Sequence, residues 1–146
     1  MSRVQLALNV SYLDAAVTFY SKLFGVGPAK LRPAYANFAI ADPPLKLVLV
    51  ESPARGGSLN HLGVEVVGTA QVVEAGRRLA AQGLTTATED EVSCCYALQD
   101  KVWVDDPDGA PWEVYTVLAD TEVAAACECD GGAADPAATA GQGHVT

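Results

Sequence analysis

The same order of secondary-structure signals occurs twice along the chain, and this repeat limits the fold more than any other feature. Residues 3–10 alternate apolar and polar side chains, and residues 60–67 alternate in the same way. Such alternation predicts a strand with one buried face. Each strand is followed by a helical pattern and then by further strand-like runs. We therefore expect two βαβββ modules, over residues 3–51 and 60–118, within one α+β domain at residues 1–118.

Two amphipathic helices are expected, one after the first strand of each module. In the first, apolar residues recur at helical spacing up to Gly25, and Ser11 and Asp14 have the spacing of a capping box at its start. The second is expected to begin at Gly68 and to end at Gly83. The apolar strand faces should pack on these helices, so that the helices cover the outer face of a curled mixed sheet. Further strands are expected over residues 35–41, 45–51, 85–88, 101–105 and 112–118.

Composition argues against several classes of partner and location. Nine basic and eighteen acidic residues give a formal charge of −9, which disfavours nucleic acid or an anionic membrane surface as a partner. No apolar run approaches the ~18 residues of a membrane span, and the N-terminus lacks the pattern of a signal peptide. We therefore expect a cytoplasmic protein whose four cysteines are free thiols. Residues 119–146, rich in Ala, Gly, Asp and Thr, are expected to be a disordered tail.

Three side chains that can bind a metal ion fall on equivalent strand positions. Gln5, His61 and Glu113 each lie near the start of a predicted strand, on the face that the helices should not cover. If the sheet curls, the three converge in one cavity. An imidazole, a carboxylate and an amide oxygen suit a borderline or hard divalent ion and leave coordination positions open. Considered one at a time, each residue also has a structural interpretation without a metal ion. His61 could be a half-buried strand histidine, Glu113 a solvated carboxylate and Gln5 a surface amide.

Three segments resemble the vicinal oxygen chelate superfamily, which includes glyoxalases, bleomycin resistance proteins and extradiol dioxygenases. They are Asp105–Val114 (DDPDGAPWEV), Asn60–Val64 (NHLGV) and Phe19–Gly25 (FYSKLFG). In the family pattern, the glutamate of the first segment and the histidine of the second bind the metal. The resemblance covers residues 3–118 and implies the curled sheet of two βαβββ modules around a divalent ion.

A narrower resemblance is to the non-haem Fe(II)-dependent carbon–arsenic lyases and the related cadmium-induced proteins. It is carried by Tyr35–Ala39 (YANFA), Pro43–Leu49 (PPLKLVL) and Cys94–Val104 (CCYALQDKVWV). It implies O2-dependent removal of the organic group from trivalent organoarsenicals, which leaves arsenite and gives organoarsenical resistance. It also implies that Gln5 is the usual first metal ligand of this branch, where the wider dioxygenases have histidine.

Cys94 and Cys95 are the candidate substrate-binding residues. Thiolates prefer soft centres, and trivalent arsenic with one bond to carbon has two valences left, which two thiolates fill. Neighbouring residues of a flat strand point apart, so a shared centre requires a turn, and the polar residues 89–93 predict a loop. The ordinary alternative is a pair of buried, inert thiols. Cys127 and Cys129, in the expected tail, could deliver metalloid to this pair or be incidental.

The residues leave two other functions open. The thiols could sequester cadmium or arsenic without turnover. Alternatively, the metal site could serve a different dioxygenase or a glyoxalase-like isomerase, in which the cysteine pair has no task. Fe(II) is the expected ion, although Ni, Co, Mn or Zn could occupy the same ligands. The organic group on arsenic and the choice between monomer and homodimer also stay open.

Overall fold

The computed structural model describes residues 2–94 and 96–120 of the 146-residue chain. The order of elements is βαβββ twice, as the sequence repeat predicts, with a short 3-10 helix, η1 (Pro53–Arg55), between the modules. The first module consists of β1 (Arg3–Val10), α1 (Leu13–Phe24), β2 (Lys30–Arg32), β3 (Tyr35–Ile40) and β4 (Leu45–Glu51). The second consists of β5 (Leu59–Glu65), α2 (Thr69–Ala81), β6 (Ala87–Cys94), β7 (Ala97–Asp105) and β8 (Pro111–Asp120).

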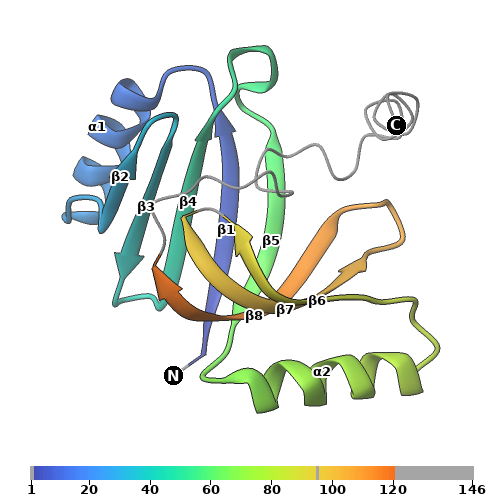
Figure 1. Ribbon diagram of the computed structural model, residues 1–146. Helices are drawn as coiled ribbons and strands as arrows, with labels where there is room; N and C mark the ends of the chain where they lie inside the picture. The colour runs from blue at the N-terminus through green and yellow to red at the C-terminus, as the bar shows by residue number, and fades with distance from the viewer. Residues whose placement is uncertain (1, 95, 121–146) are drawn as a thin grey trace.

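These strands form one mixed sheet, in the order β2-β3-β4-β1-β5-β8-β7-β6. β1 and β5, the first strands of the two modules, pair antiparallel at the centre. Each has the last strand of its own module as its parallel neighbour on the other side. The sheet curls so strongly that β7 and β8 run across the view in which β1 and β5 stand upright (Figure 1). The expected curled mixed sheet is therefore confirmed.

The two helices lie on the outer side of the curled sheet (Figure 1). α1 packs on β3 and β4 through a core that includes Leu13, Phe38 and Leu49. α2 packs on β7 and β8 through residues that include Val72 and Val102. Because side chains alternate along a strand, covering one face with helices leaves the opposite, concave face for polar residues. The concave side is therefore the face on which the strands can bring buried polar side chains together.

Replacing Phe38 by alanine should destabilise the fold strongly. Phe38 is 0% exposed and packs in the core beneath α1, and truncating a buried phenylalanine costs ~3–5 kcal/mol. We expect a loss of that size in the free energy of unfolding, measured by urea denaturation. Phe19→Ala is the matched control, because Phe19 is 58% exposed, and it should change the free energy by less than ~1 kcal/mol. Equal losses in the two variants would contradict this description of the core.

The capping box expected at the start of α1 does not form. Tyr12 is the N-cap residue, and it makes no side-chain capping hydrogen bond. The backbone N–H of Leu13 instead donates to Glu51 Oε2, 2.8 Å away at the end of β4. A residue distant in the sequence thus accepts a hydrogen bond from a backbone N–H of the first helical turn. A local sequence motif could not reveal this contact. The helix ends as expected at Gly25, whose φ of 71° is the left-handed conformation that favours glycine.

Residues 89–93 belong to a strand, which corrects the expected loop. β6 runs through them to Cys94 and pairs antiparallel with β7. The pairing is irregular between Glu89 and Val92, and Glu91 has a φ of 49°. The backbone N–H of Glu91 donates to Asp100 Oδ1 at 2.7 Å, so both the backbone and a side chain of β7 hold this polar edge strand. Pairing with β7 therefore outweighs the polar composition of the segment.

The described part of the chain ends with β8, which continues to Asp120. The rest of the expected tail, with Cys127, Cys129 and His144, lies outside the described residues, as does Cys95. In the part of the chain that the structure describes, neither helix combines the length and the apolar character that crossing a membrane requires.

Candidate functional site

Gln5, His61 and Glu113 lie on the adjacent strands β1, β5 and β8. The cross-strand register places Gln5 and Glu113 on either side of Gly63. His61 precedes Gly63 by two residues and therefore shares its face of the strand. All three side chains are buried, since the residues are 4%, 2% and 3% exposed. The fold thus brings together side chains that are up to 108 residues apart in the sequence.

The three side chains meet through their polar atoms. His61 Nε2 lies 2.6 Å from Glu113 Oε2, and Gln5 Nε2 lies 3.1 Å from each of these two atoms. Ligand atoms ~2.1 Å from one ion and at right angles to one another would be ~3.0 Å apart. These three atoms form a triangle of about this size, so a small divalent ion fits once His61 and Glu113 separate slightly and Gln5 presents its oxygen in place of Nε2. Among the described residues, no three His, Cys, Asp or Glu side chains cluster to hold an ion, so the set depends on the amide of Gln5.

Gly63 leaves the space in which the three side chains meet. A Cβ atom at this position would lie 3.0 Å from Gln5 Nε2, 3.0 Å from Glu113 Cγ and 3.1 Å from Glu113 O. One of these neighbours is a backbone atom, which cannot swing aside. The sequence signal for this role is a glycine within an alternating strand, on the same face as His61.

Gly63→Ala should weaken metal binding while leaving the fold intact. The added methyl group would displace Gln5 and Glu113 together, and disturbing the groups that orient metal ligands typically lowers affinity ~10–100-fold. A competition titration of a divalent ion against a fluorescent chelator measures the change. Gly27→Ala is the matched control, because a Cβ there has no neighbour within 4 Å, and its metal affinity should equal that of the wild type. An unchanged affinity in Gly63→Ala would contradict the crowded geometry.

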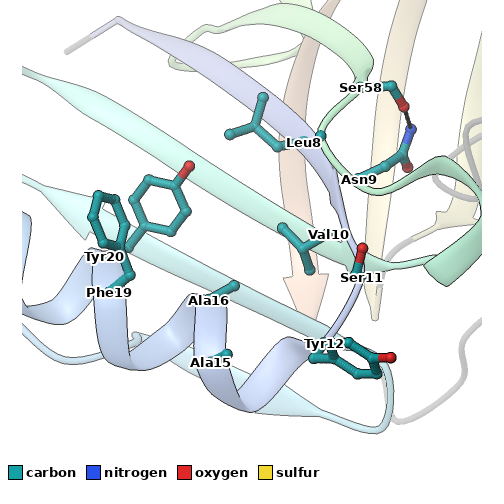
Figure 2. A pocket seen from close by; sticks show the side chains of 11 residues that line it. Leu8, Asn9, Val10, Ser11, Tyr12, Ala15, Ala16, Phe19, Tyr20 and Ser58 are labelled. Carbon is teal, nitrogen blue, oxygen red and sulfur yellow. Dashed lines mark hydrogen bonds between the residues drawn. The ribbon is translucent and has the colours of Figure 1, made fainter.

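A chain of hydrogen bonds reaches the His61 ring from the side opposite the triangle. His61 Nδ1 lies 2.6 Å from Asn60 Oδ1, and Asn60 Nδ2 donates to Asn9 Oδ1 at 2.9 Å. Asn9 Nδ2 donates to Ser58 Oγ at 2.9 Å, the bond drawn in Figure 2. The Ser58 hydroxyl finally donates to the backbone carbonyl of Arg55.

The direction of this chain determines which nitrogen of His61 carries a proton. Because a carbonyl can only accept, Ser58 donates to it, and each amide in turn presents its oxygen toward His61. Asn60 Oδ1 therefore requires a donor, which is the N–H of His61 Nδ1. The electron pair of Nε2 then faces Glu113 Oε2, another electron-pair donor, at 2.6 Å. Two electron pairs this close repel each other unless a positive charge lies between them. A proton or a metal ion can supply that charge, so the arrangement of these two atoms fits a metal site.

Lys101 of β7 neutralises the buried carboxylate of Glu113. Its side chain is 1% exposed, and its Nζ forms an ion pair with Glu113 Oε1 at 2.9 Å. Burial alone would raise the pKa of Glu113. The charge of Lys101, and the hydrogen bond that His61 donates when Nε2 also carries a proton, outweigh burial and hold this pKa at about 2. Glu113 is therefore ionised, which is the form that binds a metal ion.

Lys101 and Trp103 are parts of the site that the sequence did not predict. They share one face of β7, and the Trp103 ring meets the His61 ring edge to face, with centroids 5.4 Å apart. Lys101 Nζ lies 5.3 Å from the centre of the Trp103 ring. Lysine is almost never fully buried without a partner, so a lysine in a strand is expected at the surface until its partner is known. The sequence signal for the two residues is the alternation of side chains along a strand, which places Lys101 and Trp103 on one face.

Tyr115 and Glu65 continue the site on the other side of Gln5. The Tyr115 hydroxyl lies 2.7 Å from Gln5 Oε1 and 3.0 Å from Glu65 Oε1. Glu65 forms ion pairs with Arg3 at 3.2 Å and with Lys46 at 3.5 Å. Burial would raise the pKa of Glu65, but these two cations outweigh it and lower the pKa. Burial and the charge of Glu65 raise the pKa of Tyr115 far above its ordinary value, so the hydroxyl keeps its proton.

Cys94 is the last residue of β6, and it pairs with Ala97 across the hairpin. Tyr96 joins this hairpin to the strands at the opposite end of the sheet order. It is buried, its ring centroid lies 5.5 Å from that of Tyr35, and its carbonyl accepts a hydrogen bond from Lys30 Nζ at 3.0 Å. The segment that carries the cysteine pair therefore contacts β2 and β3, while the side chains of both cysteines lie outside what the structure describes.

Two of the hollows in the described part of the chain are lined in part by residues of β1. One, of about 440 Å³, lies between α1 and the end of β1, and its mostly apolar lining includes Tyr12, Phe19 and Tyr20 (Figure 2). None of the three candidate metal ligands lines it. The other, of about 270 Å³, is lined in part by Glu65 and Lys46. The second hollow therefore adjoins the candidate metal site through the network around Gln5.

Two relatives share most of their length with this chain. A protein from Thermomonospora curvata named trivalent organoarsenical cleaving enzyme is 61% identical over 126 residues, which are 86% of this chain and 83% of that protein. The cadmium-induced protein CadI of Mycobacterium tuberculosis is 65% identical over 123 residues, which are 84% of this chain and 80% of that protein.

The fold is also found in more distant proteins. An extradiol ring-cleaving dioxygenase from B. fuscum matches with a TM-score of 0.59 at 20% identity, over 82% of this chain and 34% of that chain. The pattern of the Glyoxalase/Bleomycin resistance protein/Dioxygenase superfamily matches residues 3–114. The repeated modules, the curled sheet and this match agree, and the chain belongs to the Glyoxalase/Bleomycin resistance protein/Dioxygenase superfamily.

Proposed function

We propose that the chain is a non-haem Fe(II)-dependent enzyme that uses O2 to cleave the carbon–arsenic bond of trivalent organoarsenicals, with release of arsenite. The observation that carries the proposal is the convergence of Gln5, His61 and Glu113 in one buried triangle. The name of the T. curvata relative, at 61% identity, supports the substrate. The activity would confer resistance to organoarsenicals. It would operate in the cytoplasm, where reducing conditions keep thiols free.

Each residue of the triangle has a defined part in holding the ion. His61 would present Nε2, because Asn60 engages Nδ1, and Glu113 is ionised beside Lys101. An amide oxygen, an imidazole and a carboxylate would occupy one side of the ion and leave its other positions open. Fe(II) held there would supply the oxidative chemistry, and Mn, Co, Ni or Zn could compete for the same ligands.

Cys94 and Cys95 are proposed to bind the arsenic atom of the substrate. Two thiolates fill the two valences of trivalent arsenic that carries one organic group. Lys30 and Tyr35 contact Tyr96 and so hold the adjoining hairpin, which would keep the bound arsenical over the concave face. Anchoring the substrate in this way makes its encounter with the metal site effectively intramolecular.

Anaerobic reconstitution with Fe(II), followed by oxygen uptake on adding a trivalent organoarsenical, tests the proposal. We expect uptake that requires both Fe(II) and the arsenical, with arsenite as a product. Protein loaded with Zn²⁺ is the control, because Zn²⁺ has no redox chemistry, and it should bind the arsenical without consuming oxygen. Binding of the arsenical by the Fe(II) form without oxygen uptake would refute turnover.

Sequestration of a thiophilic ion is the second candidate function. It is favoured by the adjacent cysteines and by 65% identity to a protein named as cadmium-induced. It predicts that Cd(II) protects the thiols from a blocking reagent and that no oxygen is consumed. A different dioxygenase or a glyoxalase-like activity would instead survive thiol blocking. Oxygen uptake that is lost when the thiols are blocked separates the lyase from both alternatives.

A further inference from the structure

The amide of Gln5 faces the metal site with the wrong atom for a ligand. Its Nε2 lies 3.1 Å from both His61 Nε2 and Glu113 Oε2. An amide nitrogen is a hydrogen-bond donor, however, and the electron pairs that can bind a metal ion are on Oε1. Oε1 points away from the triangle, toward the Tyr115 hydroxyl at 2.7 Å. Binding of a metal ion by Gln5 therefore requires the amide to turn over.

Turning a buried amide ordinarily leaves polar groups without partners. Gln5 is 4% exposed and Tyr115 is 0% exposed, so water cannot replace a lost hydrogen bond. After the turn, Nε2 would face Tyr115, which must then accept a hydrogen bond where it formerly donated one. A hydroxyl can do both, because it has one proton and two electron pairs. Its proton needs another acceptor, and Glu65 Oε1 lies 3.0 Å from the hydroxyl oxygen.

We propose that Tyr115 and Glu65 are positioning residues that set the orientation of Gln5. In the metal-free protein, the Tyr115 hydroxyl donates to Gln5 Oε1 and holds the amide in its non-binding orientation. In the metal-bound protein, the hydroxyl donates to Glu65 Oε1 and accepts from Gln5 Nε2, so that Gln5 Oε1 faces the ion. The hydroxyl rotates and no proton is transferred. This inference rests on the proposed metal site and adds two residues to it.

Glu65 is held where this exchange needs it. Arg3 Nη2 lies 3.2 Å from Glu65 Oε1, and Lys46 Nζ lies 3.5 Å from the same atom. Lys46 Nζ also lies 5.1 Å from the centre of the Tyr115 ring. These contacts fix the carboxylate beside the hydroxyl, so Tyr115 has an acceptor for its proton in either state of Gln5.

Two substitutions of Glu65 distinguish this role from a simple effect of charge. Glu65→Gln and Glu65→Met both remove the ion pairs with Arg3 and Lys46, but only glutamine offers an oxygen to the Tyr115 hydroxyl. With Zn²⁺ as the probe ion, we expect Glu65→Met to lower the affinity ~10–100-fold and Glu65→Gln to stay within about threefold of the wild type. Adding Tyr115→Phe to Glu65→Met removes the stranded hydroxyl and should restore part of the affinity. Equal losses in Glu65→Gln and Glu65→Met would overturn the proposal.

The orientation of the amide can be measured in the wild-type protein without any variant. In nitrogen-15-labelled protein, the side-chain amide protons of Gln5 should show nuclear Overhauser contacts to the His61 ring without metal. They should show contacts to the Tyr115 ring when Zn²⁺ is bound. Unchanged contacts on Zn²⁺ binding would overturn the role of Tyr115 and leave the metal site standing. Failure of the wild-type protein to bind Zn²⁺ or Fe(II) would instead refute the metal site itself.

Discussion

Glu113→Gln is expected to abolish metal binding and to destabilise the metal-free protein. A neutral amide replaces the only carboxylate of the triangle, so the affinity for Fe(II) should fall by more than ~100-fold, the upper end for residues that merely support a ligand. The same change leaves Lys101, which is 1% exposed, without its 2.9 Å ion partner. Removing one partner of a buried pair costs ~3–5 kcal/mol. Anaerobic competition titration and urea unfolding measure the two effects.

Lys101→Met combined with Glu113→Gln separates metal binding from stability. Methionine has a similar length and no charge, so the double variant should regain most of the lost free energy of unfolding. Metal binding should stay lost, because the carboxylate is still missing. A double variant that binds Fe(II) as tightly as the wild type would contradict the role of Glu113. A Glu113→Gln protein as stable as the wild type would show that the burial of Lys101 does not depend on this pair.

Serine at both Cys94 and Cys95 is expected to lower the kcat/KM of organoarsenical cleavage by ~100-fold or more, while the affinity for Fe(II) stays unchanged. Hydroxyl groups are hard donors and bind trivalent arsenic far more weakly than thiolates do. Serine and cysteine are similar in size, so the pairing of Cys94 with Ala97 in the hairpin should persist. Arsenite release under air measures kcat/KM, and anaerobic titration measures the affinity for Fe(II).

Serine at Cys127 and Cys129 is the matched control for this variant, because it removes the same number of thiols outside the hairpin. It should leave kcat at saturating substrate unchanged. A lower rate only at low substrate would indicate that these thiols help to capture the arsenical. Full activity of the protein with serine at Cys94 and Cys95 would refute arsenic binding by the hairpin, even if the metal site is correct.

The strand faces of the site could be predicted from the sequence, because alternation is a local property of the chain. Gln5, His61 and Glu113 each fall on the strand face that the helices should not cover, and the repeat of the modules indicates that the first strands are equivalent. The structure adds the register, in which Gly63 pairs with both Gln5 and Glu113. The alternation of side chains therefore predicted that the three residues share one face of the sheet. The short distances between them depend on the register and the curl of the sheet.

Contacts that depend on a partner from another element could not be predicted. The start of α1 is satisfied by Glu51 of β4 rather than by a local capping box. Lys101 is buried because Glu113 lies beside it, and the polar residues 89–93 form a strand because β7 pairs with them. The chain from Ser58 that orients His61 is likewise assembled from two strands and a loop. Each of these features depends on a tertiary contact, and the local sequence does not identify the partner.

Anaerobic titration with Fe(II) of the wild type and of Gln5→Ala, His61→Ala and Glu113→Ala tests most directly whether three strands hold one ion. We predict a single Fe(II) per wild-type chain. The affinity should fall by more than ~100-fold in His61→Ala and in Glu113→Ala, and by a smaller factor in Gln5→Ala, which removes a neutral ligand. Wild-type affinity in either His61→Ala or Glu113→Ala would contradict a metal centre at this triangle.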